Sequence, residues 1–145
     1  IVVLDTRNDY ETRIGKFQGA VELGIPSFRD FPEAIETLPE EYRSKTIVMY
    51  CTGGIRCEKA SAVMLNSGFS DVRQLDGGIL AYLEEFGGTH WDGDCFVFDQ
   101  RVALDHNLRE SEIEMCFRCR EPLSLGEQES EHYVIGEKCP YCATI

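Results

Sequence analysis

Residues 47–56 read IVMYCTGGIR and decide the fold. The first four are apolar without interruption, which is typical of a short strand buried in a parallel sheet. Cys51 follows directly, and a loop with two glycines leads into a helix that we expect over residues 57–66, with Gly68 just past its end. This order predicts that Cys51 lies at the carboxyl end of a strand, where open parallel α/β sheets bind their ligands.

The sequence on both sides of this stretch continues the pattern. Short apolar or alternating runs predict strands at residues 1–4, 20–23, 72–75 and 95–98. Apolar residues with helical spacing predict helices at residues 10–14, 31–38 (after a capping-box pattern at 27–30) and 79–86. Strands that alternate with helices predict an α/β fold, with a mostly parallel sheet flanked by helices.

The length and the net charge of the chain limit the classes of protein to which it can belong. The 145 residues suit one compact domain with a small appendage, and no apolar run approaches the ~20 residues that a membrane helix needs. The chain starts with Ile inside a strand pattern, so we expect it to be part of a longer protein. Its net charge of -12 opposes unaided binding to a nucleic acid backbone, and at the least it keeps the domain soluble.

The loop after Cys51 has the chemistry of an anion site. Gly53 and Gly54 can turn successive backbone N–H groups inward, and Thr52 and Ile55 complete this ring of donors before the helix begins. Such surroundings favour a thiolate, so we predict Cys51 as the nucleophile. Arg56 adds a fixed positive charge, and its loss should cost ~10²–10³ in rate while the fold survives. The alternative is a buried cysteine followed by an ordinary glycine turn.

The length of the loop bears on the substrate. Four residues separate Cys51 from Arg56. Cysteine phosphatases with a related loop have five, which makes a wider cradle for a phosphate ester. The shorter loop resembles the sulfur-handling rhodanese version, which suits a persulfide on the cysteine.

Residues 49–61, MYCTGGIRCEKAS, resemble the active loop of the bacterial tRNA uridine hydroxylases, a family with a rhodanese domain. Residues 4–8, 74–79 and 96–102 also match that family, and the resemblance extends over essentially the whole chain. It implies oxygen-dependent hydroxylation of the wobble uridine of tRNA to 5-hydroxyuridine, with Cys51 acting through a persulfide. It also implies an N-terminal domain, absent here, and because this chain is acidic we expect the basic surface for tRNA to come from the absent part. The residues indicate no organic cofactor.

Further residues near the loop are candidates for supporting roles. Asp5 and Arg7 follow the first strand, and we favour a pair that braces the loops over one that adds positive potential. Cys57 is either a thiol that resolves an oxidised or persulfidated Cys51 or a small packed residue. Lys59 is predicted either to extend the positive rim of the pocket or to lie on an exposed helix face.

Four cysteines near the C-terminus form two Cys-x-x-Cys pairs with 19 residues between them: Cys116, Cys119, Cys139 and Cys142. This spacing is close to that of a zinc ribbon and predicts a closed, structural zinc site, the alternatives being disulfides or free thiols. An odd total of seven cysteines fits reduced thiols in a cytoplasmic protein. We therefore divide the chain into a rhodanese-like domain, residues 1–104, and a linker with a cysteine-rich segment, residues 105–145.

Three functions remain open on these patterns. The first is a catalytic module of a tRNA uridine hydroxylase with Cys51 as its reactive group. The second is a sulfurtransferase that moves sulfur from thiosulfate to a small acceptor. The third is a non-enzymatic interaction module held together by a metal.

Overall fold

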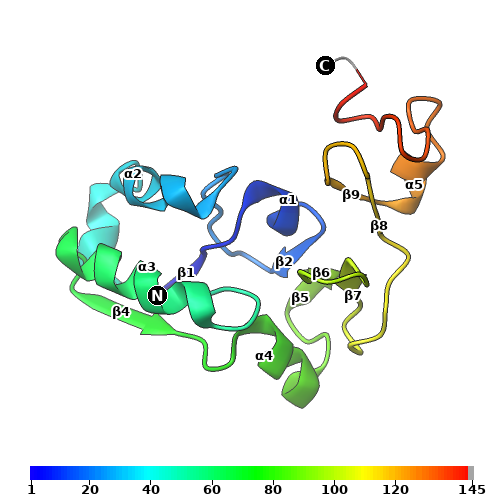
Figure 1. The fold of residues 1–145 in the computed structure, drawn as a ribbon. Coiled ribbons are helices and arrows are strands. Elements are labelled where there is room, and N and C mark those ends of the chain that lie inside the picture. The colour runs from blue at the N-terminus through cyan, green and yellow to red at the C-terminus, as the bar shows by residue number, and fades with distance from the viewer. Residues whose placement is uncertain (144–145) are drawn as a thin grey trace.

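A three-stranded parallel sheet forms the centre of the computed structural model, which describes residues 1–143 (Figure 1). The strand order is β1-β3-β4, with β1 at Val2–Asp5, β3 at Thr46–Tyr50 and β4 at Asp71–Gln74. All pairs are parallel, so the carboxyl ends of the strands share one edge. The predicted α/β fold is confirmed, and its central strand β3 ends directly before Cys51.

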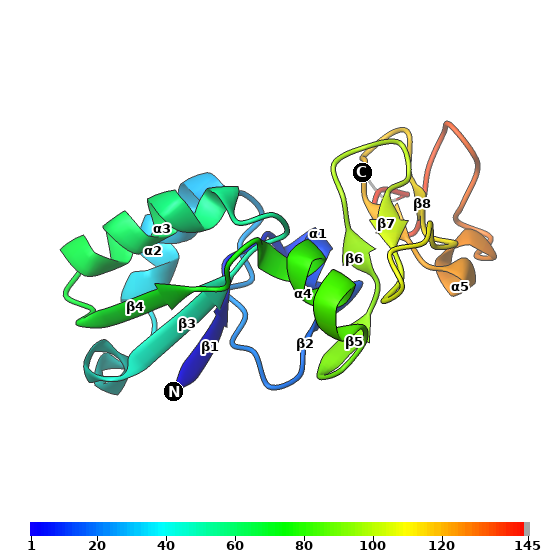
Figure 2. The ribbon, with the colours of Figure 1, turned by 90° about the horizontal axis from the view of Figure 1, so that it is seen from below.

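Helices cover one face of this sheet. α2 (Phe31–Glu36) and α3 (Ile55–Asn66) lie together beside the strands, as Figure 2 shows. Their buried residues pack against Ile47 and Met49 of β3. Because side chains alternate along a strand, Tyr50 points the other way and joins a second apolar cluster.

The second cluster lies on the opposite face. It contains residues of α4 (Gly78–Phe86) and of a two-stranded antiparallel sheet made by β2 (Gly15–Phe17) and β5 (Trp91–Gly93). The buried rings of Phe17 and Trp91 meet edge to face, with their centroids 4.9 Å apart. This cluster fixes β3 from its other side, so the end of the strand is held between two packed layers.

Some predicted elements differ from the structure. The strand expected at residues 20–23 is a single bridge between Val21 and Leu4, and the true strand is β2, where Gly15 leaves room for the close approach of Asp94. The helix expected at residues 10–14 is α1, Asp9–Thr12. The strand expected at 95–98 is shorter: β6, Cys95–Phe96.

One helix start and one helix cap also differ from the prediction. α3 begins at Ile55 rather than at residue 57, because Gly54 takes a left-handed φ of 94° and turns the chain into the helix immediately. Ser27 forms no capping box at α2. Its hydroxyl accepts the N–H of Arg29 within the short 3-10 turn η1 (Phe28–Asp30), and a second such turn, η2 (Glu40–Ser44), precedes β3.

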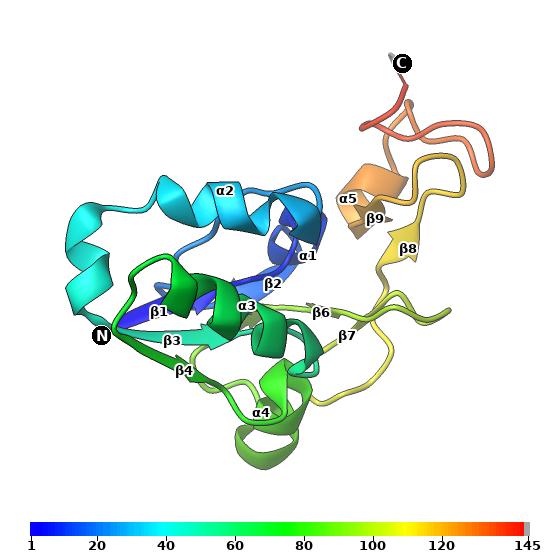
Figure 3. The ribbon, with the colours of Figure 1, turned by 60° about the vertical axis from the view of Figure 1, so that its left-hand side comes forward.

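β6 pairs with β7 (Ala103–Leu104) beside the α/β domain, where Cys95 belongs to the second cluster. The C-terminal part of the chain forms a separate small unit at one end of the molecule, with β8 (Glu114–Met115), β9 (Pro122–Leu123) and α5 (Leu125–Gln128) (Figure 3). Three of the paired cysteines and Leu123 form its buried core. The predicted segment also contains Thr144 and Ile145, which lie outside the described residues.

Arg13 connects this unit to the α/β domain. Its guanidinium donates to Glu121 Oε2 and to the carbonyl of Pro122, both at 2.8 Å, and lies 4.1 Å from the ring centroid of Tyr141. The longest helix among residues 1–143 is α3, with 12 residues, and none there is both long and apolar enough to cross a membrane.

Candidate active site

The Cys51 sulfur lies inside the loop that follows β3. The N–H of Gly54 donates to it at 3.1 Å, and the N–H groups of Arg56 and Cys57 add to this cradle. The left-handed conformation of Gly54 is what turns its N–H toward the sulfur. The side chain of Cys51 is only 1% exposed, so these donors act with little competition from water.

These contacts favour the thiolate form of Cys51. A hydrogen bond from the Cys57 thiol lowers the pKa of Cys51 most, burial opposes it, and the loop N–H groups lower it further, to about 5. The pKa of Cys57 is raised, because its thiol donates to Cys51 and is buried. Near neutral pH, Cys51 is therefore a thiolate and Cys57 a neutral donor, with Thr6 Oγ1 3.8 Å from the Cys57 sulfur.

The reactivity of Cys51 should therefore depend on pH in a way that an ordinary thiol does not. Because its pKa is lowered, the thiolate is present above pH 5 and is lost as the pH falls through that value. Alkylation by iodoacetamide, followed by intact mass, should rise through pH 5 and level off well before the ~8.5 of a free cysteine. Cys57→Ala should move this midpoint upward, and Cys57→Ser less so. A midpoint near that of free cysteine in the wild type would contradict the assignment.

Arg56 is held by a carboxylate that the motif does not contain. Its guanidinium makes a two-pronged contact with Glu11, at 2.6 and 2.7 Å, and Nη2 lies 3.4 Å from Thr52 Oγ1. Glu11 is completely buried. Burial would lower the pKa of Arg56, but the hydrogen bonds and charge of Glu11 outweigh it and raise the pKa, with a further contribution from the charge of Cys51. Arg56 thus places a permanent charge beside the thiolate.

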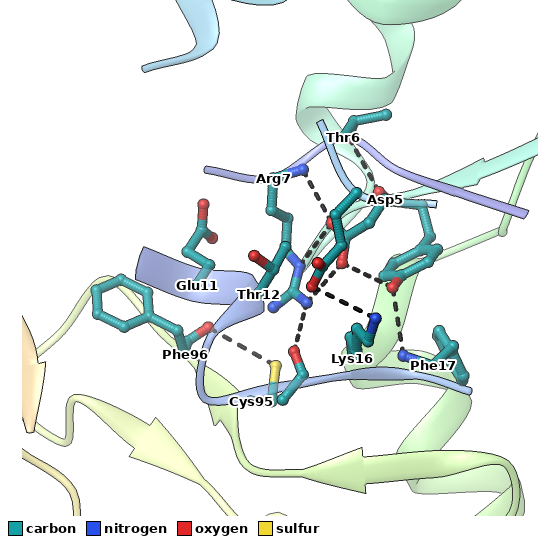
Figure 4. Close-up of polar contacts among 12 residues, drawn as sticks. Asp5, Thr6, Arg7, Glu11, Thr12, Lys16, Phe17, Cys95 and Phe96 are labelled. Atoms are coloured by element: carbon teal, nitrogen blue, oxygen red, sulfur yellow. Dashed lines mark hydrogen bonds and ion pairs between the residues drawn. The ribbon is translucent and has the colours of Figure 1, made fainter. Parts of the chain in front are cut away.

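Asp5 and Arg7 form a buried pair that braces the ends of the strands (Figure 4). Arg7 donates to both carboxylate oxygens of Asp5, at 3.0 and 2.8 Å, and to the carbonyl of Gly15 at 2.7 Å. The hydroxyl of Tyr50 donates to Asp5 at 2.7 Å. Since Arg7 and Asp5 are both inaccessible to solvent, Arg7 presents no charge to the pocket surface.

A cavity of about 410 Å³ opens above Cys51. Its lining comes from segments far apart in sequence: Asn8, Phe28, Cys51, Thr52, Gly53, Ile55, Arg56, Leu80 and Phe98. Lys59 is exposed on α3 and does not belong to this lining. The sequence therefore identified the floor of the pocket, in the loop, but not the walls that Phe28, Leu80 and Phe98 provide.

The N-terminus of α4 supports the loop from outside. Ile79 N–H donates to the carbonyl of Cys51 at 3.0 Å, and Leu80 N–H to that of Thr52 at 3.2 Å. Gly78 lies at this contact with a φ of 68°, and a Cβ there would lie 2.5 Å from the Thr52 carbonyl oxygen. Only glycine lets the two segments approach this closely.

Gly78→Ala should therefore damage both stability and reactivity. The new methyl group must push the loop away, and the positive φ adds strain, so the free energy of unfolding should fall by about 2 kcal/mol or more. Urea unfolding measures the first effect, and the iodoacetamide midpoint of Cys51 the second. Gly126→Ala is a matched control, because its added methyl would meet no atom within 4 Å. Equal stability of the two variants would contradict this role of Gly78.

The four paired cysteines form a second candidate site, able to hold a metal ion. Their sulfur atoms all lie within 4.8 Å of one another. The sulfurs of Cys116 and Cys142 are 3.9 Å apart, those of Cys119 and Cys139 3.5 Å, and those of Cys139 and Cys142 3.7 Å. Four sulfurs at ~2.3 Å from a tetrahedral ion would be about 3.8 Å apart, so the residues fit such a group.

The fold and the Cys51 site together define a cysteine-dependent α/β domain whose loop N–H groups stabilise a thiolate at the end of a central parallel strand. The profile of the Rhodanese-like domain matches residues 1–85. The chain belongs to this family.

Known proteins resemble the chain beyond that domain. Over 142 residues it is 52% identical to a protein of Cupriavidus necator and 51% identical to one of Cupriavidus pinatubonensis, each named tRNA uridine(34) hydroxylase. Each alignment covers 98% of this chain and 50% of the relative, so the chain spans about half the length of the curated relatives it matches. The X-ray structure of a rhodanese-like domain from Anabaena sp. is 25% identical, with a TM-score of 0.51, over 63% of this chain and 80% of that one.

Proposed function

We propose that this chain is the catalytic rhodanese module of a tRNA uridine(34) hydroxylase, which converts the wobble uridine to 5-hydroxyuridine. The observation that carries the proposal is the likeness of 50–52% to proteins of that name, which runs through both the rhodanese domain and the cysteine-rich segment. The buried thiolate of Cys51 supports it, because it supplies a reactive group at the base of an open pocket.

The residues of the site suit formation of a persulfide. The Cys51 thiolate attacks the outer sulfur of a donor such as thiosulfate, a new S–S bond forms, and sulfite leaves with the electron pair of the bond that breaks. The loop N–H groups and Arg56 then stabilise the negative charge of the persulfide. Cys57 donates to the sulfur of Cys51 and in this proposal positions it.

We propose tRNA as the partner and the cytoplasm as the location. The chain has a net charge of -12, which disfavours tRNA binding by this chain alone. In this proposal, the half of the relatives that the chain does not match corresponds to a domain that supplies basic surface. Activity is therefore expected of the full-length protein.

Isotope labelling tests the function. The full-length protein should form 5-hydroxyuridine on unmodified tRNA under ¹⁸O₂, and nucleoside mass spectrometry should find the product at position 34. The proposal would be refuted if no tRNA gave 5-hydroxyuridine, either with the protein alone or in reactions supplemented with cell lysate.

A thiosulfate sulfurtransferase is the second candidate. It is favoured by the short loop of four residues between Cys51 and Arg56, which suits a persulfide. It predicts rapid turnover of thiosulfate and a small thiol acceptor by this chain alone. The hydroxylase predicts that the chain takes up one sulfur atom and then releases it slowly. Sulfite release measured over many turnovers separates the two.

We propose that the metal of the C-terminal site is Zn²⁺, bound by all four thiolates, and that residues 105–145 are a linker and structural segment beside the domain of residues 1–104. Four sulfur ligands in a closed tetrahedron leave no open position, so the ion would stabilise this segment rather than take part in catalysis.

Removal of zinc should loosen the C-terminal segment alone. Elemental analysis should find about one zinc per chain, and Cys139→Ser should lose it. Limited proteolysis of that variant should cut within the C-terminal unit while the α/β domain stays intact. Cys95→Ala, which removes a buried cysteine outside the cluster, should keep the metal. Wild-type protein that binds no zinc when purified under reducing conditions would refute the site.

A further inference from the structure

Phe98 is an exposed aromatic side chain held in a fixed place at the rim of the Cys51 pocket. Its side chain is 65% exposed, yet its ring meets Phe96 edge to face at 5.0 Å, and the guanidinium of Arg56 lies 5.4 Å from its centroid. Ile55, on the loop side of the pocket, is 82% exposed. Large apolar groups left in water beside a reactive thiolate indicate a surface that a ligand covers.

The turn that carries Phe98 is well braced. Between β6 and β7, the N–H of Val97 donates to the carbonyl of Val102 at 2.8 Å, and Arg101 pairs with Asp99 at 2.6 Å. Phe28 from η1 and Leu80 from α4 form other walls of the same cavity. The pocket is thus an apolar slot with the Cys51 loop at its base.

Asn8 belongs to the lining, but its polar side chain serves the fold. It is 9% exposed, and it forms the capping box with Glu11 that begins α1. Its amide nitrogen donates to the hydroxyl of Tyr10 at 3.0 Å, and its side-chain oxygen is buried. The surface that the cavity offers a ligand is therefore mainly apolar, with Phe98 and Ile55 as its exposed groups.

We infer that this slot receives the extruded base of the substrate uridine, with Phe98 stacking on its ring. The inference rests on the proposed function and adds the residue that holds the base beside Cys51. Proteins that read single-stranded RNA stack bases on aromatic side chains. The exposed ring of Phe98 at the rim of the Cys51 pocket is such a group.

The structure also offers a path for the neighbouring nucleotide. Phe98 is a shared wall between the Cys51 pocket and a second cavity of about 260 Å³, which Tyr10, Arg120 and Glu121 help to line, the Glu121 carboxylate being paired with Arg13. An RNA strand that places one base beside Cys51 can therefore continue past Phe98 toward an aromatic ring and a cation, the groups that bind single strands.

Variants of Phe98 test the stacking in the full-length protein. Phe98→Ala should lower kcat/KM for 5-hydroxyuridine formation about 10- to 100-fold, the usual effect of losing one stacked base. Phe98→Tyr should retain most of the activity. Phe86→Ala removes another exposed ring, outside both cavities, and should have no effect. Sulfur loading of Cys51 from thiosulfate, read by intact mass, should be equal in all four proteins.

A second measurement tests recognition without turnover. An anticodon stem-loop with 5-iodouridine at the wobble position should photo-crosslink to the peptide that contains Phe98.

The two proposals fail in different ways. Unchanged kcat/KM in Phe98→Ala, or a crosslink only outside the pocket, overturns the base site while the hydroxylase function stands. A wild-type protein that makes no 5-hydroxyuridine but crosslinks at Phe98 refutes the function and keeps the base site. Loss of sulfur loading in Phe98→Ala also overturns the inference, because it would show a structural role.

Discussion

Cys51→Ser should abolish sulfur loading and lower 5-hydroxyuridine formation by about 10³-fold or more in the full-length protein. The site is built to stabilise a charged sulfur: the Gly54 N–H lies 3.1 Å from it, and its pKa falls to about 5. A serine hydroxyl stays protonated near neutral pH and cannot form a persulfide. The rate should therefore fall to the background of a protein that binds tRNA but lacks its reactive group.

Cys57→Ser is the matched control, because it makes the same change of atom six positions along the chain. It retains Cys51 and a donor beside it, so sulfur loading should persist. Nucleoside analysis of tRNA and intact mass after thiosulfate treatment give the two readouts. Unchanged 5-hydroxyuridine in Cys51→Ser would show that the chemistry takes place elsewhere, and equal loss in both variants would show that the two thiols act as a pair.

The sequence predicted the parts of the site that are local. A strand, a loop with two glycines and a helix follow one another between residues 46 and 66, so their geometry is determined by neighbours in the chain. The same holds for the Asp5–Arg7 pair, two residues apart. The spacing of the paired cysteines likewise predicted a cluster, and the sulfurs do come together.

What the sequence did not show depends on distant contacts. Glu11 and Arg56 are 45 positions apart, and neither local pattern indicates that they meet. The sequence does contain one signal for Glu11, because it stands three residues after Asn8, which is the spacing of a capping box. In the structure, the Glu11 carboxylate accepts the Asn8 N–H at 2.9 Å. Phe98 was expected in a strand, but β6 ends at Phe96, and the chain turns so that Phe98 reaches the pocket.

The Glu11 contact changes what is expected of Arg56→Ala. From the sequence, this variant should lose rate while its fold survives. In the structure, the change also leaves the fully buried Glu11 carboxylate without its counter-charge. Removing one partner of a buried ion pair typically costs 3–5 kcal/mol. Because Arg56 is itself partly exposed, we expect the free energy of unfolding to fall by about 3 kcal/mol, together with the loss of rate.

A double variant separates the two effects. Glu11→Gln with Arg56→Ala removes the buried charge as well as its partner, so it should regain a large part of the lost stability, since a neutral amide is less costly to bury. Its sulfur loading should stay low, because the cation beside Cys51 is still missing. Urea unfolding and thiosulfate loading of the wild type, both single variants and the double variant complete the cycle. If the double variant recovered loading along with stability, Arg56 would act only by holding the fold, and its electrostatic role at Cys51 would be wrong.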